Sequence, residues 1–454
     1  MIRYTLSEIL EPTAGRLLVK GTRYFTGISI DSRTIREGEL FIALRGERFD
    51  GHDFLEPALK KGGGAVVSCP PVIPVMGKSI IHVDNTLRAL QSIARHRRLT
   101  RDVKVVAITG TNGKTTTKEM IAEILARDYK VLRSRGNLNN QIGLSLSLTR
   151  LNSHRFAVLE MGASRVGDIT ELSEIARPDI CVITNIAPAH LEGFASLDMV
   201  RKTKLEIVDY VNTVVVNGVD PYLRPVLPEL LSDDRFSVIT FGLNAGTDVW
   251  AEEIRHLKDG IRFKLHLRDA QAAEIKLRIF GLFNVLNALA AASVCSHLGV
   301  PLVNIKGALE EFKGVPMRVE IREMRGATVI SDLYNANPAS MEEAIKELVR
   351  MRQSRAVAVL GDMLELGAYE EEAHRKLGRW LSTHSVDVLI TVGELMSYTH
   401  EEFNGINCMN GKRPSYHVNT PHEAREILRE IVKSGDVVLI KGSRGMKMER
   451  ILED

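Results

Sequence analysis

The stretch GTNGKTT places residue types that bind phosphate at close spacing. Glycines let backbone N–H groups turn toward an anion, and the N-terminus of a following helix adds positive potential. Lys114 can neutralise the outer phosphates of a nucleotide, and the hydroxyl of Thr115 can bind Mg²⁺. The predicted nucleotide contacts in this loop are Gly110, Thr111, Asn112, Gly113, Lys114, Thr115 and Thr116.

The spacing of this loop departs from the usual phosphate-loop pattern. Only Thr111 and Asn112 separate the first glycine from the Gly-Lys pair, which is fewer residues than usual. An ordinary strand-to-helix turn is therefore the alternative. Gly-Lys-Thr between an apolar run and a helix makes that turn the weaker interpretation, and we predict a nucleoside triphosphate site.

The segments around the loop predict a parallel α/β sheet. The run Val103–Thr109 is rich in Val and Ile, as in a buried parallel strand, and apolar residues from Met120 onward recur at helical spacing. Similar strands are predicted at Phe156–Met161, Cys181–Ile186 and Thr213–Asn217. Strands that alternate with helices form a doubly wound sheet, which binds ligands beyond the carboxyl ends of its strands.

Further polar residues stand close to these strands in the sequence. Glu160 ends one strand, where a phosphate-loop enzyme holds Mg²⁺ through oxygen ligands; a solvent-facing glutamate is the alternative. Asn185 and His190 follow the next strand, although a lone histidine in a loop is often a surface residue. Amide side chains also precede a helix, as turn residues or as contacts for a polar ligand: Asn137, Asn139 and Asn140.

The length of 454 residues exceeds what one core supports, and we predict three α/β domains. Residues 1–100 contain short strands and helices, 101–314 carry the phosphate loop, and 315–454 form a Rossmann-like block. Within the central domain, residues 248–280 alternate as in a small antiparallel patch. We expect the phosphate loop to face clefts to both neighbouring domains.

Composition excludes several classes of partner. The formal net charge of +3 gives no general case for nucleic acid, and the basic run from Arg95 to Arg101 has no interleaved aromatic residue for base stacking. The four cysteines are too scattered for a zinc or redox site. The N-terminus lacks a signal-peptide core, and no apolar run is long enough to span a bilayer. We predict a cytoplasmic protein without membrane insertion.

The residues alone lead to a Mg²⁺–ATP enzyme with a large polar substrate. A GTPase would need a guanine-reading Asn-Lys-x-Asp segment, which the sequence lacks. A kinase, a ligase and a mechanical ATPase all stay open at this point.

Several motifs together resemble the Mur ligase family of ATP-dependent amide-forming enzymes. TGTNGKTT is similar to the phosphate loop of that family, LEMGAS to its Mg²⁺-binding glutamate, TNIAPAHLEGF to its histidine loop and KTKLEI to the segment of its modified lysine. FNVLNALAA resembles the adenine-side helix, MRVE the third-domain arginine and SDLYNANPASM the ribose-binding stretch. The resemblance covers nearly the whole chain.

The resemblance implies a role for individual residues. It assigns chemistry to Lys114, Lys204, His190 and Arg318, with Lys204 carbamylated, and it places Mg²⁺ on Thr115, Glu160, His190 and Lys204. It assigns ATP contacts to Asn284, Asn287, Arg318, Asp332 and Tyr334, and substrate contacts to Ser29, Asp31, Ser32, Arg33, Asn137, Asn139, Asn140 and Asn335. One departure is Phe283, where the family commonly has His: a stacking role survives, but a hydrogen bond from that His does not.

Within the family, one member adds D-alanyl-D-alanine to UDP-N-acetylmuramoyl-tripeptide. Four segments resemble that member: DSRTIREGELFIALRGERFDGHDF in the first domain, NLNNQIG, YNANP and GDMLELG. This resemblance implies ATP and Mg²⁺ as cofactors, an acyl phosphate intermediate, small-molecule substrates and a monomer. The Asp-Asn-Pro-Arg motif of the sibling that adds the third residue is absent. A folylpolyglutamate synthase-like ligase and a non-ligase phosphate-loop ATPase are the competing interpretations.

Overall fold

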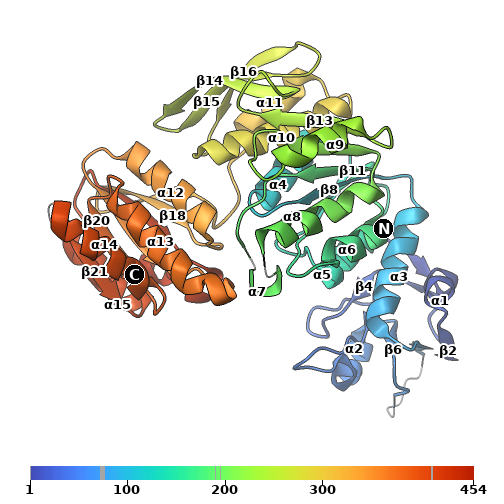
Figure 1. Ribbon diagram of the computed structural model, residues 1–454. Coiled ribbons are helices and arrows are strands. Elements are labelled where there is room, and N and C mark those ends of the chain that lie inside the picture. The colour runs from blue at the N-terminus through green and yellow to red at the C-terminus, as the bar shows by residue number, and fades with distance from the viewer. Residues whose placement is uncertain (1, 72–76, 190, 195, 411–412, 454) are drawn as a thin grey trace.

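A computed structural model of the protein describes residues 2–71, 77–189, 191–194, 196–410 and 413–453, apart from the side chains of 407–410. The chain forms three α/β domains, each built around its own main sheet. Figure 1 shows them as separate bodies, coloured blue for the first, cyan to yellow for the central and orange to red for the third. The predicted α/β, three-domain architecture is confirmed.

The first domain is a small mixed sheet with strand order β2-β7-β6-β5-β4, beside a two-stranded β1-β3 pair. Its last helix, α3, begins at the side-chain cap of Asn85 and runs out of the domain. The elements are β1 (Tyr4–Thr5), α1 (Leu6–Thr13), β2 (Arg16–Val19), β3 (Tyr24–Phe25), β4 (Ile28–Ser29), β5 (Leu40–Ile42), η1 (Gly51–Phe54), α2 (Leu55–Lys61), β6 (Gly64–Val67), β7 (Ser79–His82) and α3 (Thr86–Leu99).

The central domain is a nine-stranded sheet with the order β16-β15-β14-β13-β12-β11-β8-β10-β9. Strands β8 to β14 pair in parallel, whereas β14-β15 and β15-β16 pair antiparallel. The predicted antiparallel patch therefore continues the parallel sheet at one edge. The strands are β8 (Lys104–Thr109), β9 (Val131–Arg133), β10 (Phe156–Glu160), β11 (Ile180–Ile183), β12 (Thr213–Asn217), β13 (Ser237–Gly242), β14 (Val249–Leu257), β15 (Gly260–His266) and β16 (Ala272–Leu277).

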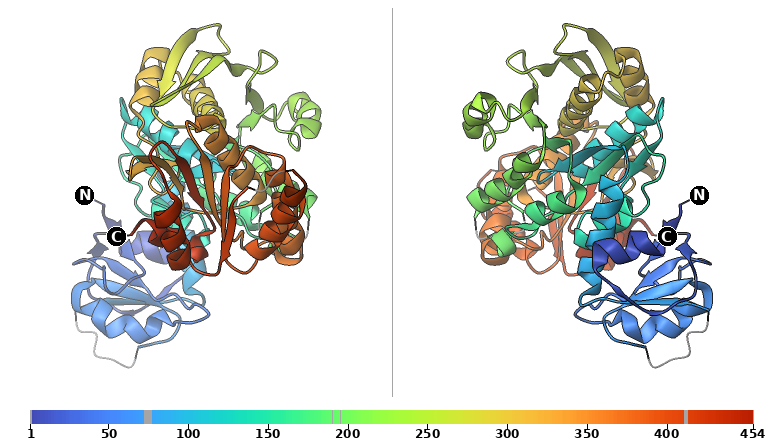
Figure 2. Two further views of the ribbon diagram at one scale, coloured as in Figure 1. Left: turned by 90° about the vertical axis from the view of Figure 1, so that its left-hand side faces the viewer. Right: turned by 90° about the vertical axis from the view of Figure 1, so that its right-hand side faces the viewer.

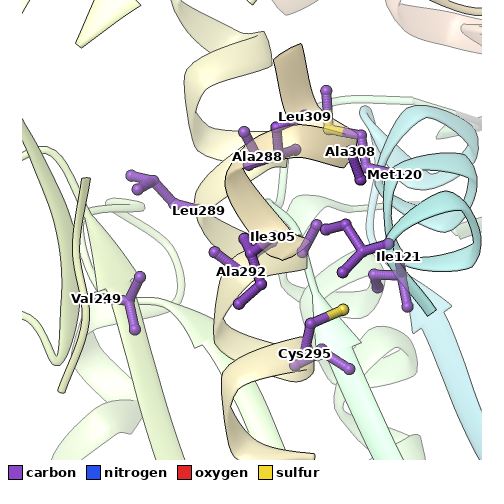
Figure 3. Packing of buried hydrophobic residues seen from close by; sticks show 14 of the residues in the cluster. Met120, Ile121, Val249, Ala288, Leu289, Ala292, Cys295, Ile305, Ala308 and Leu309 are labelled. Carbon is purple, nitrogen blue, oxygen red and sulfur yellow. The ribbon is translucent and has the colours of Figure 1, made fainter. Parts of the chain in front are cut away.

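Helices cover both faces of the central sheet, because its strands are apolar on both sides. On one face α10 lies between α4 and the antiparallel edge; Figure 3 shows Ala292 and Cys295 of α10 between Val249 and Ile121. The helical elements are α4 (Lys114–Ala126), α5 (Gln141–Leu148), α6 (Asp168–Ala176), α7 (Leu191–Phe194), α8 (Leu197–Leu205), η2 (Glu206–Tyr210), η3 (Arg224–Val226), α9 (Leu227–Ser232), α10 (Leu282–His297) and α11 (Leu302–Glu311).

The third domain is a six-stranded sheet with the order β17-β18-β22-β19-β20-β21, parallel except for the β17-β18 hairpin. Its helices α12, α13 and α15 begin at Pro338, Glu370 and Pro421. The elements are β17 (Glu320–Met324), β18 (Ala327–Asp332), α12 (Pro338–Met351), β19 (Ala356–Gly361), η4 (Gly367–Tyr369), α13 (Glu370–Ser382), β20 (Val388–Val392), α14 (Met396–Asn410), β21 (Ser415–Val418), α15 (Pro421–Ile431), β22 (Val437–Lys441), η5 (Arg444–Met446) and η6 (Met448–Leu452).

The first domain packs against the central domain through helix α3. Helix α3 packs against α5 and α6, and Figure 2 shows it (light blue) rising from the first domain along the central one. Buried Arg97 donates from Nε to the carbonyl of Leu151 at 2.8 Å, and the Tyr4 hydroxyl donates to the carbonyl of Thr149. Because α3 shares its packing between the two domains, we propose the boundary at its end, near residue 100, and the second boundary near residue 315.

The third domain touches the central domain at a few points. Gly367 of η4 lies against Glu192 of α7, and His256 of β14 lies 3.7 Å from Glu347 of α12. Further contacts involve the phosphate loop and form part of the site described below. In the part of the chain that the structure describes, no helix is both long and apolar enough to cross a membrane.

Candidate active site

A cleft of about 1200 Å³ lies between the central and third domains. The predicted residues that line it are Gly110, Thr111, Asn112, Gly113, Lys114, Thr116, Asn137, Asn139, Asn140, Glu160, Lys204, Asn284, Asn287, Arg318, Asp332, Tyr334 and Asn335. Among the described residues, no side chain of the first domain lines it. The expectation that the phosphate loop faces clefts to both neighbours is therefore met on one side only.

The phosphate loop connects β8 to α4 and needs its two glycines. Gly110 has φ +132° and Gly113 has φ +82°, conformations that L side chains rarely adopt. A Cβ on Gly110 would meet Thr184 Oγ1 at 2.1 Å, and one on Gly113 would meet Asn287 Oδ1 at 2.3 Å. The loop is held by the next strand end, since Asn185 accepts from the N–H of Asn112 at 2.9 Å.

Lys114 stands at the first position of α4 and points back into its own loop. Its Nζ donates to the carbonyls of Gly110 at 3.0 Å and Thr111 at 2.8 Å. Desolvation lowers the pKa of Lys114, the nearby carboxylate of Glu160 opposes this and Arg318 adds to it. These two carbonyl contacts are ones that a phosphate can replace with stronger, charge-assisted contacts.

Glu160, at the end of β10, is the centre of a buried polar cluster. Its Oε2 accepts from the hydroxyl of Thr115 at 2.8 Å, and its Oε1 accepts from the amide of Asn139 at 2.9 Å. The hydroxyl of Ser134 accepts from the Glu160 backbone N–H at 3.1 Å. Thr115 itself is buried beneath the cleft rather than lining it. The carboxylate is thereby oriented toward the phosphate loop.

Arg318 brings the third domain to this cluster. Its Nη2 donates to Thr115 Oγ1 at 3.0 Å, and its guanidinium lies 4.0 Å from the centre of the Tyr334 ring. The planar group is thus fixed by one hydrogen bond and one stacking contact.

Asp332 lies in the stretch that resembles the ribose-binding segment of the family. In the structure, buried Lys441 of β22 pairs with Oδ2 and also donates to the carbonyl of Asn335 at 2.9 Å. One oxygen of Asp332 is thus paired with Lys441, and the ribose contact stays a prediction.

Asn287 and Asn284 occupy successive turns of α10 under the loop. Asn287 accepts from the hydroxyl of Thr117 at 3.2 Å and donates to Asn284 Oδ1 at 3.0 Å, and Asn284 donates to the carbonyl of Phe280 at 2.6 Å. Phe283, on the same turn, also lines the cleft. Its position is compatible with the predicted stacking role.

Lys204, near the end of α8, is 3% exposed and lines the cleft. Burial, reinforced by the positive charge of Lys114, lowers its pKa to about 7, against weaker opposing contributions from Asp168 and Glu206. Its Nζ lies 5.8 Å from the ring centre of Phe194. Lys202, two residues earlier, instead pairs with Asp198 at the surface. The two lysines of this helix therefore differ in environment.

Some predicted residues lie outside this cluster. Ser29 ends β4 of the first domain, Asp31, Ser32 and Arg33 follow it, and none of the four lines the cleft. Arg33 chelates Asp31 from Nε at 2.9 Å and Nη2 at 2.8 Å, and these hydrogen bonds lower the pKa of Asp31 to about 2. His190 falls outside the described residues, so its predicted role in catalysis and metal binding stays a prediction.

The oxygen ligands fit Mg²⁺ better than a transition metal. Glu160 and Thr115 supply a carboxylate and a hydroxyl, and Mg²⁺ binds through one or two carboxylates together with phosphate oxygens and water. Within the described residues, no three His, Cys, Asp or Glu side chains gather as a metal cluster. A site of this kind needs the phosphates of a nucleotide to complete it.

The three domains each match a domain of one enzyme family. Residues 24–98 match the Mur ligase family catalytic domain, residues 108–295 the Mur ligase middle domain, and residues 317–444 the Mur ligase glutamate ligase domain. A relative in Bacillus subtilis (strain 168), UDP-N-acetylmuramoyl-tripeptide–D-alanyl-D-alanine ligase, is 34% identical over 100% of this chain and 98% of its own length. The chain belongs to the Mur ligase family.

Solved structures support the same conclusion for this Mur ligase. MurF from Acinetobacter baumannii superposes with a TM-score of 0.90 at 32% identity, covering 99% of this chain and 98% of that one. MurF ligase from Thermotoga maritima in complex with ADP superposes with a TM-score of 0.81 at 30% identity, covering 94% and 96%. The sequence resemblance to the family is thereby confirmed.

Sequence reasoning missed two cleft residues of the ligase. Asn337 lies in SDLYNANPASM, the stretch that resembles the ribose-binding segment, but it was given no role of its own; its amide pairs with Asn112 of the phosphate loop. Lys441 lies in the apolar run of β22, where a charged residue needs a buried partner. A single lysine in an apolar strand was the one feature of the sequence that could have indicated a buried ion pair at this position.

Proposed function

We propose that this Mur ligase joins D-alanyl-D-alanine to UDP-N-acetylmuramoyl-tripeptide with ATP as the energy source, for peptidoglycan precursor synthesis. The observation that carries the proposal is the hydrogen-bonded chain Arg318–Thr115–Glu160 across the cleft. It joins a cation of the third domain, a phosphate-loop hydroxyl and a carboxylate, which are the groups that phosphoryl transfer requires. The relatives of full length act on these substrates by name.

In the first step, a carboxylate oxygen of the tripeptide attacks the γ-phosphorus of ATP. The bond from that phosphorus to the β–γ bridging oxygen breaks, which leaves ADP and an acyl phosphate. Lys114 and Arg318 offset the negative charge on the transferred group, which is where most of the catalysis in phosphoryl transfer lies. Their placement beside Glu160 and Thr115 favours this role.

In the second step, the amine of D-alanyl-D-alanine attacks the acyl carbonyl carbon. The new C–N bond forms, the C–O bond to phosphate breaks, phosphate leaves and the nitrogen loses a proton. Water competes with the amine for the acyl phosphate, so the cleft between two domains has to exclude it. Its walls come from both domains, which lets domain closure perform this function.

Glu160 and Thr115 are the residues that would hold Mg²⁺, together with the predicted ligands His190 and a carbamylated Lys204. The ion, when bound, would neutralise charge on the phosphates. Asn284 and Asn287, with Phe283, would lie on the adenine side, and Asp332 with Tyr334 would lie near the ribose. Ser29, Asp31, Ser32 and Arg33 would contact the uridine end of the substrate, and Asn137, Asn139, Asn140 and Asn335 the peptide end.

The test is phosphate release from ATP with each substrate supplied in turn. We expect release to require UDP-N-acetylmuramoyl-tripeptide and to reach full rate only with D-alanyl-D-alanine. The assay uses tripeptides with lysine and with diaminopimelate as the third residue, and folate polyglutamates as the competing acceptor. Lys114→Ala should slow release by orders of magnitude, about 10²-fold or more. Steady hydrolysis that ignores all substrates would favour a non-ligase ATPase.

Two further expectations stay predictions: that the ligase acts in the cytoplasm and that it is a monomer. Sedimentation in the presence of ATP and the nucleotide tripeptide tests the monomer directly.

A further inference from the structure

The amide side chains of Asn112 and Asn337 bond to each other across the domain boundary. Asn337 Nδ2 donates to Asn112 Oδ1 at 2.9 Å, and Asn112 Nδ2 donates back to Asn337 Oδ1 at 3.4 Å. Asn112 belongs to the phosphate loop, and Asn337 is the residue that caps α12 of the third domain. The pair is therefore a reciprocal link between the two walls of the cleft.

Each asparagine is fixed on its own side of this link. Asn337 is 9% exposed, and its Oδ1 also accepts from the N–H of Ser340 at 2.9 Å, which anchors it to the first turn of α12. On the other side, the N–H of Asn112 donates to Asn185 Oδ1 at 2.9 Å, and its carbonyl accepts from Thr184 Oγ1 at 2.6 Å and from Asn185 Nδ2 at 3.1 Å.

The chain of contacts runs from the end of β11, through the phosphate loop, to the N-terminus of α12. Because the side chain of Asn337 is anchored to α12 and the backbone of Asn112 is anchored to Thr184 and Asn185, a displacement of α12 has to move or break the link to Asn112. We propose that Asn337 is a positioning residue for the ligation: it holds the phosphate loop in register with the third domain through Asn112. This inference rests on the proposed function and adds a residue to its machinery.

The competing explanation is that Asn337 only caps α12. The two roles separate in Asn337→Ser, because serine caps helices about as well as asparagine but is too short and lacks the amide that reaches Asn112. The matched control is Thr420→Ala, which removes the cap of α15 in the same domain, where the Thr420 hydroxyl accepts from the N–H of Glu423 at 3.3 Å, away from the cleft.

The first readout is hydrogen exchange of residues 110–116 in the full chain without substrates. We expect faster exchange of the phosphate loop in Asn337→Ser and unchanged exchange in Thr420→Ala. A pure capping role would leave the loop unchanged in both, and that result would overturn the proposal. This readout needs no turnover, so it is independent of the proposed function.

The second readout is a double-mutant cycle on kcat/KM for ATP with Asn112→Ala. Each single variant should lose about tenfold, as expected for one or two neutral hydrogen bonds, and the double variant should lose little more. Losses that multiply would overturn the link. If Asn337→Ser does not fold, Asn337→Thr takes its place in both measurements. Wild-type ligation, measured first, shows whether the proposed function itself holds.

Discussion

Arg318 of the third domain donates from Nη2 to the hydroxyl of Thr115 in the phosphate loop at 3.0 Å. The same hydroxyl donates to Glu160 at 2.8 Å, so one side chain connects an arginine and a carboxylate from different domains. The predicted nucleotide site is therefore assembled only when these domains meet. A change at Arg318 tests the chemistry and the assembly together.

Arg318→Ala should lower kcat by about 10²- to 10³-fold, because it removes the positive charge that is proposed to offset the negative charge of the transferred phosphoryl group. Arg318→Lys should recover only part of this loss, since lysine keeps the charge but lacks the planar group that stacks on Tyr334. Steady-state kinetics with saturating substrates measure both. Equal rates for the lysine variant and the wild type would mean that charge alone is needed.

Lys204→Ala should lose most activity, and short carboxylic acids should restore part of it by supplying the oxygen ligands of the predicted carbamate. Addition of CO₂ needs a neutral amine, and burial with the charge of Lys114 lowers the pKa of Lys204 to about 7, which favours it. Lys202→Ala is the matched control, on the same helix but exposed and paired with Asp198. Full activity of Lys204→Ala would contradict the role.

The lowered pKa of Lys204 also predicts how the stability of the fold depends on pH. Its pKa falls from 10.5 unfolded to about 7 folded, so between these values the unfolded chain binds more protons and stability rises with pH. In CO₂-free buffer, Lys204→Met should unfold at a higher temperature than the wild type below pH 7, and this advantage should shrink toward pH 10.5. Thermal melts at several pH values measure it; an advantage that grows with pH would contradict the assignment.

Lys441 and Asp332 form a buried ion pair. Removing one partner should lower the free energy of unfolding more than replacing both with apolar residues. Lys441→Met alone should destabilise the third domain by about 3 kcal/mol, because it leaves a carboxylate without its partner. The double variant Lys441→Met with Asp332→Leu should recover much of that stability. Urea unfolding of the full chain measures both. A double variant as unstable as the single one would show that the pair is not the cause.

The sequence predicted well what depends on neighbours along the chain. The strand, loop and helix around Gly110 follow from local spacing, and β8, β10 and β12 lie within one residue of their predicted positions, whereas β11 ends three residues before its predicted end. Glu160, named from its strand end, and Lys204, named from a short motif that resembles the family, both line the cleft.

Contacts between distant segments escaped the sequence analysis. Asn337 and Asn112 are separated by 225 positions, and nothing in either segment indicates the other. The helix α14 was missed because its composition has no clear amphipathic pattern. Ser29 and Arg33 were assigned to the substrate, but whether a first-domain loop reaches the cleft depends on the placement of whole domains, which short motifs do not encode.

The most direct test of the acyl phosphate route follows an oxygen atom. The nucleotide tripeptide, labelled with ¹⁸O in its terminal carboxylate, is incubated with ATP, D-alanyl-D-alanine and the ligase, and the released phosphate is analysed by mass spectrometry. The route predicts that each phosphate carries one ¹⁸O atom, because the attacking carboxylate oxygen leaves with phosphorus when the amide forms. Unlabelled phosphate released alongside the amide product would contradict it.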